Sequence, residues 1–327
     1  MSGPTPLLQI EGLTVTFPTR AGPVAVVDEV HLDIAPGEVL GIVGESGSGK
    51  SVTALSILRL VTKPGRIASG SIRFAGDDLL AKTEHEMHRL RGAAISMIFQ
   101  EPMSSLNPVF SIGDQIMEPL RQHRGLDRRA ARTEAIELLR LVEMPHAERR
   151  VDEYPHQLSG GMRQRAMIAI ALACRPRLLI ADEPTTALDV TIQAQILDLL
   201  RSLQRDLGMA VLLITHDLGV VAEFAHRAMV MYAGRVVECA PVAELFAAPR
   251  HPYTQGLIAS MPAMDGPRRA LTSIPGTVPQ PARMPLGCRF SPRCPHARDL
   301  CSAAVPPRRI VAPDHDVACV LHAGAAR

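Results

Sequence analysis

The sequence predicts an α/β fold for residues 1–250, because short apolar runs alternate with segments of helical period. The runs Val39–Val43, Leu178–Ala181 and Ala210–Ile214 have the near-continuous hydrophobicity of buried strands. Helical segments follow them. In Val190–Leu207 the apolar residues fall on one face, and Gly208 ends the pattern. This alternation is typical of a sheet covered by helices.

The other predicted elements follow from the same patterns and from the positions of proline and glycine. Further strands are predicted at Leu7–Ile10, Leu13–Phe17, Val24–Ile34, Gly70–Ala75, Ala94–Phe99, Ala228–Tyr232 and Arg235–Cys239, and further helices at Ser51–Leu60, Glu84–Arg91 and Leu218–Phe224. A helical insertion over residues 103–175, with an amphipathic example at Ala130–Val142, interrupts the alternation. Proline becomes frequent after His251, so a second domain is predicted over residues 251–327, as a small irregular extension.

A glycine-rich stretch directly follows the strand Val39–Val43 and directly precedes a helix. It reads Gly44-Glu45-Ser46-Gly47-Ser48-Gly49-Lys50-Ser51 and matches the G-x-x-x-x-G-K-[ST] pattern. Its backbone N–H groups and the positive helix end suit phosphate oxygens. Lys50 is expected to reach the β- and γ-phosphates and Ser51 to ligate Mg²⁺. The sequence therefore predicts a nucleoside triphosphate site.

The bulk composition excludes several classes of protein. The chain has 327 residues, 46% of them hydrophobic, 21% charged, and a net charge of +2. Such values fit a globular chain with a full core. They lack the strong positive charge that is typical of a nucleic-acid-binding protein. The first residues show no secretory signal pattern, and the longest apolar run, Ala166–Cys174, is far shorter than a membrane span. A cytosolic chain is expected, with any membrane association made through a partner.

Two acidic residues end the predicted strand Leu178–Ala181. Asp182 is placed to bind Mg²⁺ beside the phosphate loop, and Glu183 to orient or deprotonate an attacking water. By themselves they would more often be two solvated acids before the turn at Pro184. Together with the phosphate loop, the roles in binding Mg²⁺ and activating water are favoured.

A third motif, Leu158-Ser159-Gly160-Gly161-Met162, opens the helix that continues to Ala173. Ser159 is a good N-cap, and the two glycines leave the first-turn amides uncovered. The positive end of this helix is therefore expected to face an anion. As a capping sequence alone the pattern is common, and its position about twenty residues before Asp182 makes it specific.

The order of these motifs resembles the ATPase subunits of ABC transporters. The motifs that carry the resemblance are Gly44–Ser51, Gln100, Leu158–Met162, Asp182-Glu183, Ala187-Leu188-Asp189 and His216. The resemblance implies a P-loop NTPase (RecA-like) core with an antiparallel β subdomain and a helical insertion. It also implies that ATP lies between one subunit's phosphate loop and the Ser159-Gly160-Gly161 segment of another, in a head-to-tail dimer.

The same resemblance assigns roles to individual residues. Gln100 would ligate Mg²⁺ and sense the γ-phosphate, and His216 would hold the γ-phosphate and the attacking water. Asp189 would brace the dimer interface. Phe17, or the loop after it, is a candidate to stack on the adenine ring, although an ordinary core aromatic is an equal alternative. An isolated monomer is expected to hydrolyse ATP poorly.

Two further stretches narrow the family. The loop 100–108 resembles that of oligopeptide and dipeptide importer ATPases, and so do the tail segments 251–257 and 274–279. The implied partners are a second ATPase chain, two permease subunits and, indirectly, an extracytoplasmic binding protein, with the chain on the cytoplasmic face of the membrane. Relatives of this type also move nickel complexes, glutathione and sugars. A soluble ABC ATPase without a permease is the less favoured alternative.

Four of the six cysteines lie near the C-terminus: Cys288, Cys294, Cys301 and Cys319. In a reducing cytosol such a set favours a metal or cluster over disulfides. The spacing contains no C-x-x-C pair, which weakens a zinc-ribbon interpretation, whereas four thiolates suit a [4Fe–4S] cluster. Importer ATPases of this type with such clusters are known. Buried free thiols are the alternative, and His296, His315 and His322 are weaker candidate ligands.

Overall fold

The computed structural model describes residues 5–20, 22–100, 105–186, 188–261, 273–280 and 283–322. The chain forms two compact units, each assembled from separate stretches of sequence. The helical unit comprises Met1–Leu7, Ile34–Glu38 and Ala81–Ile214, and the phosphate-loop unit comprises Leu8–Asp33, Val39–Leu80 and Thr215–Arg327. Each unit carries its own part of the predicted nucleotide machinery.

The helical unit contains three parallel strands, β6 (Ile95–Ile98), β7 (Leu178–Asp182) and β8 (Ala210–Ile214). Every residue of β7 and β8 is buried, as expected of strands covered on both faces. The register pairs Asp182 with Ile214, so both strands end at the same edge of the sheet.

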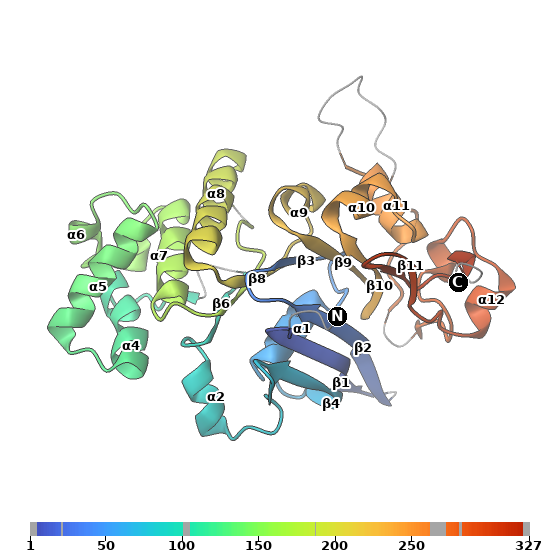
Figure 1. The fold of residues 1–327 in the computed structure, drawn as a ribbon, viewed down its shortest axis with the longest axis horizontal. Helices are drawn as coiled ribbons and strands as arrows, with labels where there is room; N and C mark the ends of the chain where they lie inside the picture. The colour runs from blue at the N-terminus through green and yellow to red at the C-terminus, as the bar shows by residue number, and fades with distance from the viewer. Residues whose placement is uncertain are drawn as a thin grey trace. The chain divides into compact units, whose positions relative to one another are not determined.

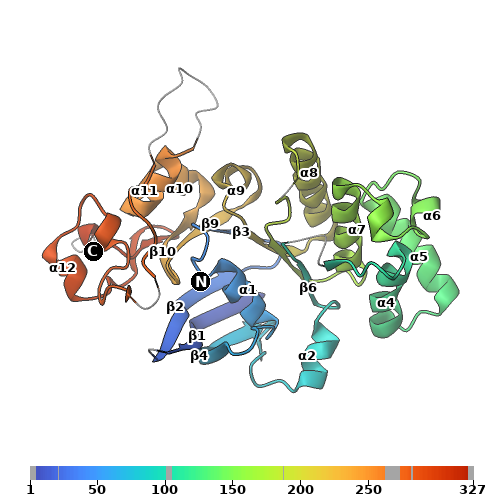
Figure 2. The ribbon, with the colours of Figure 1, turned by 180° about the vertical axis from the view of Figure 1, so that it is seen from behind.

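The helices of this unit pack on one another beyond the strands, and α4, α5, α6 and α7 lie side by side in both views (Figures 1 and 2). They are α2 (Glu84–Leu90), α4 (Ile112–Arg124), α5 (Arg128–Leu141), α6 (Ala147–Arg150), α7 (Gly160–Leu172) and α8 (Val190–Leu207), with a 3₁₀ turn at Pro155–Gln157. Local capping sets several boundaries. Asp127 accepts a hydrogen bond from the Ala130 amide at the start of α5, and α8 ends at Gly208.

The phosphate-loop unit has an antiparallel sheet of β1 (Leu8–Thr19), β2 (Gly22–Ile34), β4 (Arg66–Phe74) and β5 (Asp77–Asp78). The sequence pattern predicts two strands, Leu7–Ile10 and Leu13–Phe17, but the structure has the single strand β1 there. The register of β1 against β4 shifts between Glu11 and Thr14, and Gly12 adopts φ 60°. A bulge at this glycine therefore replaces the predicted break.

A second set of strands in this unit runs in the order β11, β12, β10, β9, β3. These are β3 (Val39–Val43), β9 (Arg227–Tyr232), β10 (Arg235–Pro241), β11 (Arg309–Ala312) and β12 (His315–Val317). Only the β3–β9 pair is parallel among them. The helices are α1 (Lys50–Ile57), α9 (Leu218–Phe224), α10 (Val242–Ala247), α11 (Pro252–Ala259) and α12 (Asp299–Ala303), with 3₁₀ turns at Ser291–Arg293 and Val320–His322.

The C-terminal extension is built into this unit and contains more regular structure than its proline content suggested. Strand β12 pairs with β10, so residues near the C-terminus extend the strand order that includes β3. The rings of Tyr232, Tyr253 and Phe290 contact one another, with centroids 4.7–5.4 Å apart. This aromatic cluster joins β9, α11 and the extension in one buried core.

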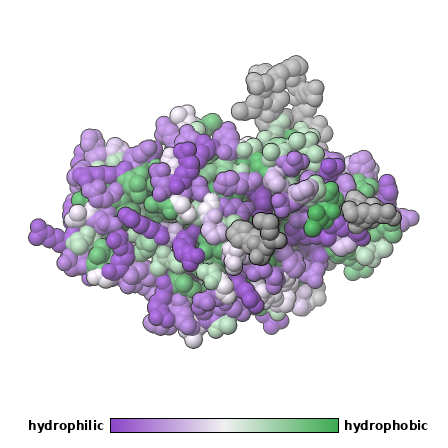
Figure 3. Space-filling view, in the orientation of Figure 1, coloured by the Kyte–Doolittle hydropathy of each residue, from purple (hydrophilic) through white to green (hydrophobic). Residues whose placement is uncertain are grey.

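The outer surface agrees with the composition. Hydrophilic residues cover most of the face shown in Figure 3, and apolar residues gather only in small groups. Across the described ranges, no helix combines the length and the hydrophobicity that a bilayer span requires.

Candidate functional site

The phosphate loop connects β3 to α1 in the phosphate-loop unit. Gly44 has φ 154°, and a Cβ there would lie 2.1 Å from the Met231 carbonyl oxygen. The backbone thus approaches β9 too closely for any side chain at this position. Ser46 and Gly47 form the exposed tip of the loop, while Ser48, Gly49 and Lys50 are buried.

Lys50 begins α1 and is only 6% exposed. Its Nζ donates to the carbonyl oxygens of Gly44, at 2.7 Å, and Glu45, at 3.0 Å. Ser51 follows in the first turn of α1 and is half-buried. The loop therefore folds around its own lysine, as a phosphate cradle requires.

His216 belongs to the same unit and is exposed. It follows Thr215, whose amide donates to the Ile42 carbonyl oxygen in β3 at 3.2 Å. The next residue, Asp217, caps α9 by accepting from the Gly219 amide at 2.8 Å. The backbone of His216 therefore lies next to the end of β3 from which the phosphate loop starts.

Phe17 lies near the end of β1 and is half-buried. A Cβ on Gly65 would stand 2.5 Å from Phe17 Cζ, so the ring edge packs closely against Gly65. Adenine stacking by Phe17 stays a prediction, and this packing holds the ring in place.

The helical unit brings Gln100, Asp182 and Glu183 to the carboxyl ends of two neighbouring parallel strands, β6 and β7. Asp182 is 4% exposed. Gln100 Nε2 donates to Glu183 Oε2 at 2.9 Å, and Thr186 Oγ1 donates to the same oxygen at 2.8 Å. Ligand sites of α/β folds form at this edge of a sheet. Thr186 is a contact that the sequence analysis missed.

Glu183 has a constrained backbone. Its φ is 47°, and its amide donates to the Ile214 carbonyl oxygen at 2.8 Å. A left-handed conformation is uncommon for glutamate and occurs often at functional sites. The constraint fixes the direction in which this carboxylate leaves the strand.

The predicted anion-facing helix end is exposed. Ser159 caps α7 by accepting from the Met162 amide at 3.4 Å, and Gly160 and Gly161 are the first helical residues. Ser159 and Gly160 are exposed and Gly161 is half-buried. Asp189 caps α8 in the same way, accepting from the Ile192 amide at 2.9 Å. Ala187 and residues 101–104 of the predicted loops lie outside the described residues.

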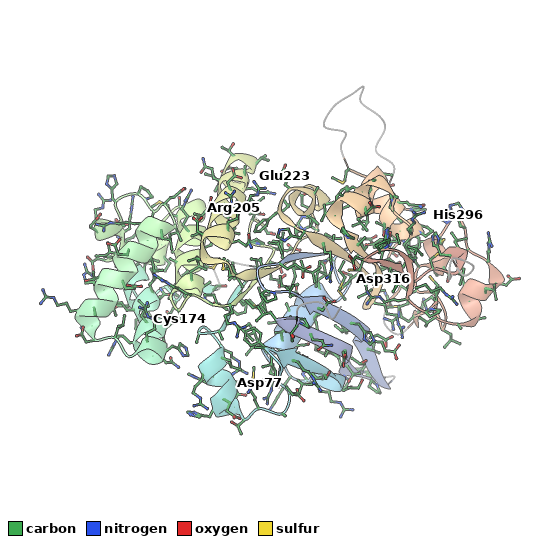
Figure 4. The ribbon with its side chains drawn as sticks, viewed as in Figure 1. Asp77, Cys174, Arg205, Glu223, His296 and Asp316 are labelled. Atoms are coloured by element: carbon green, nitrogen blue, oxygen red, sulfur yellow. The ribbon has the colours of Figure 1, made fainter. Side chains whose placement is uncertain are left out.

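The four C-terminal cysteines line one small pocket together with His251 and His296. Figure 4 shows His296 in the extension. The Cys288 amide donates to the Cys301 carbonyl oxygen at 2.7 Å. Burial raises the pKa of the Cys288 thiol to about 11, and burial also raises the pKa of Cys294 and of Cys319. The structure therefore gathers the predicted thiols.

The four cysteines that line this pocket do not form a metal-binding site in the described arrangement. Within the described ranges, no three His, Cys, Asp or Glu side chains are arranged to hold a metal ion. The pocket has about 10 Å³ of free volume, roughly the space of one water molecule. The donor chemistry suits a cluster, but the pocket as it stands has room for about one water molecule, so the cluster stays a prediction.

Two contacts of the phosphate loop come from residues that no sequence motif indicated. Tyr253 Oη accepts from the Glu45 amide at 2.9 Å, and Arg293 Nη1 donates to both Glu45 carboxylate oxygens at 3.0 Å. Residues 251–257 stood out only as part of the tail. No local signal links residues so far apart in the chain.

Comparisons with known proteins agree with these observations. Residues 27–186 match the ABC transporter family, and residues 237–301 match the oligopeptide/dipeptide transporter C-terminal region. A putative peptide import ATP-binding protein of Brucella abortus is 57% identical over 327 residues, 96% of this chain and 97% of the relative. A protein with the same description from Brucella suis is 55% identical over 296 residues, 90% of this chain and 89% of the relative.

A solved structure of an ATP-binding cassette is also similar to this chain. A dimeric ATP-binding cassette in a post-hydrolysis state, bound to ADP and Pi, has a TM-score of 0.65 and 30% identity over 72% of this chain and 98% of that chain. Its fold confirms the predicted P-loop ATPase core. The chain belongs to the ABC transporter family of ATPases.

Proposed function

We propose that this chain hydrolyses ATP to drive the import of di- or oligopeptides, paired head to tail with a second ATPase on a membrane permease. The observation that carries the proposal is that one chain presents a phosphate loop around Lys50 and, separately, an exposed helix end at Ser159–Gly161. In a head-to-tail pair each loop meets the partner's helix end, which adds positive potential at the γ-phosphate.

The residues of the two units have distinct proposed roles in the reaction. Glu183 accepts a proton from the attacking water, and Gln100, already bonded to Glu183, orients that carboxylate and senses the γ-phosphate. His216 holds the γ-phosphate and the water. Ser51, Gln100 and Asp182 would hold Mg²⁺, whose chemistry is to offset phosphate charge, and their oxygen donors suit it. Closure of the dimer excludes bulk water.

The peptide substrate is supported by the importer-type C-terminal region and by the names of the relatives. The permease and an extracytoplasmic binding protein select the solute, and the chain is held at the cytoplasmic face of the membrane through the permease. The second ATPase is a different chain in this proposal.

The test is transport by the assembled complex. The chain is reconstituted in vesicles with its permease, partner ATPase and binding protein, and uptake of labelled peptides is measured with and without ATP. ATP-dependent peptide uptake that is lost in Glu183→Gln is expected. Uptake of nickel complexes, glutathione or sugars instead of peptides would reject the substrate class. Isolation of the native protein only in soluble complexes would reject transport itself.

We also propose that the four thiols lining the small pocket hold a [4Fe–4S] cluster, for which the pocket must widen. The support is the donor set alone: four cysteines on one pocket. Anaerobic purification is expected to yield iron and sulfide that disappear in Cys288→Ser and Cys294→Ser. Cys174, which follows α7 (Figure 4), is the matched control, and Cys174→Ser should retain both. Zinc, or no metal at all, in the wild-type protein would reject the cluster.

A further inference from the structure

Glu45, the second residue of the phosphate loop, makes hydrogen bonds through its amide, its carbonyl oxygen and its carboxylate. Its carbonyl oxygen accepts from Lys50 Nζ at 3.0 Å. Its amide donates to Tyr253 Oη at 2.9 Å, and its carboxylate accepts from Arg293 Nη1 through both oxygens at 3.0 Å. Two of these three partners belong to the region that follows residue 250. That region therefore determines the orientation of a phosphate-loop residue.

Arg293 occupies a site built for its charge. Its side chain is 6% exposed, and Nε donates to the Pro275 carbonyl oxygen at 2.9 Å. Nη1 also contacts Tyr232 Oη at 3.3 Å, and the guanidinium lies 5.7 Å from the centre of the Tyr232 ring. A buried cation is tolerated only with such partners, and Glu45 supplies the opposite charge.

The charge of Glu45 matters because of what the loop binds. A carboxylate inside a phosphate loop repels a triphosphate, and because the Glu45 side chain is only 30% exposed, water screens this repulsion only in part. Arg293 offsets that charge. It also fixes Glu45, whose carbonyl oxygen positions the ammonium group of Lys50. Loss of Arg293 would therefore leave an uncompensated negative charge in the loop and loosen the lysine.

A second contact ties the extension to the same loop. Arg289 donates to the Ala233 carbonyl oxygen and to Asp28. The next residue after Ala233, Gly234, donates from its amide to the Ser48 carbonyl oxygen at 2.9 Å. The extension therefore supports the loop from the β9–β10 turn as well as through Glu45.

We propose that Arg293 is a positioning residue for ATP binding: it neutralises and orients Glu45 so that the phosphate loop accepts a triphosphate. Through Arg293, the C-terminal extension then contributes directly to ATP binding at the phosphate loop. This inference rests on the proposed function only in requiring that the phosphate loop binds ATP.

The experiment measures the ATP dissociation constant by fluorescent-nucleotide competition on the full chain, and KM and kcat on the assembled transporter. Arg293→Gln is expected to raise the dissociation constant and KM about tenfold, with a smaller change in kcat. Arg293→Lys keeps the charge and should recover most of the affinity. The loss in Arg293→Gln should shrink at high salt, because ions screen the repulsion from Glu45.

Two further variants separate this role from a structural one. In the double variant Glu45→Gln/Arg293→Gln the affinity should return to within about threefold of the wild type, since neither the carboxylate nor the guanidinium is left unpaired. Arg308→Gln is the matched control: Arg308 is an extension arginine that pairs with Asp316, at 2.6 and 2.7 Å, outside the phosphate loop. Its ATP affinity should equal that of the wild type.

The outcomes distinguish the two proposals. If wild-type protein binds no ATP, the proposed function fails. If wild-type and Arg293→Gln proteins bind ATP equally, or if the double variant stays as weak as Arg293→Gln, only the role of Arg293 is overturned.

Discussion

The exposed end of α7 offers a matched pair of substitutions for testing the head-to-tail site. A Cβ on Gly160 would meet only Leu188 Cδ2 at 3.5 Å, an ordinary contact. A Cβ on Gly161 would lie 2.8 Å from Ile192 Cγ2, which must shift. Alanine in place of glycine favours a helix by up to about 1 kcal/mol. Overpacking typically costs about 1–3 kcal/mol.

Gly160→Ala should therefore leave the free energy of unfolding unchanged or raised by up to about 1 kcal/mol. Gly161→Ala should lower it by about 0–3 kcal/mol, the overpacking cost less the helix gain. Either methyl group adds bulk to the first turn, whose amides are proposed to face the partner's nucleotide, and steady-state ATPase activity of the assembled transporter should fall at least about tenfold in each. Thermal unfolding of the chain gives the stability control. A Gly160→Ala protein with full ATPase activity would refute the contact between this helix end and the partner's nucleotide.

Two further predictions concern Glu183 and His251. Glu183→Gln should still bind ATP but release phosphate about 10²–10⁴-fold more slowly. The bound ATP should therefore elute with a trapped dimer in gel filtration. Unchanged ATP turnover would show that Glu183 is not the general base. Burial lowers the pKa of His251 from 6.5 to about 3. Only the unfolded state gains this proton between those values, so stability should fall by roughly 1.4 kcal/mol per pH unit on acidification below pH 6.5. His251→Asn keeps an acceptor for the Tyr253 amide. In denaturant titrations its free energy of unfolding should lack this part of the dependence on pH. An equal dependence on pH in the variant and the wild type would show that His251 is not its source.

The sequence alone determined the elements that depend on local chemistry. The predicted bounds of β8, α8 and α9 are those of the structure. In α8 an aspartate caps the first turn, an apolar stripe continues the helix, and Gly208 ends it in a left-handed conformation. The strand–loop–helix around Lys50 was predictable for the same reason, because neighbours in the chain supply its pattern.

How distant segments meet depends on the packing of the folded chain. The bulge at Gly12 depends on the register with β4, and the pairing of β12 with β10 depends on a long chain return. Tyr253 and Arg293 reach Glu45 across 208 and 248 residues. Such contacts leave no period or spacing in the sequence, because packing selects them after the chain has folded back. The motif thus identified a nucleotide loop, and the fold revealed that the extension holds it.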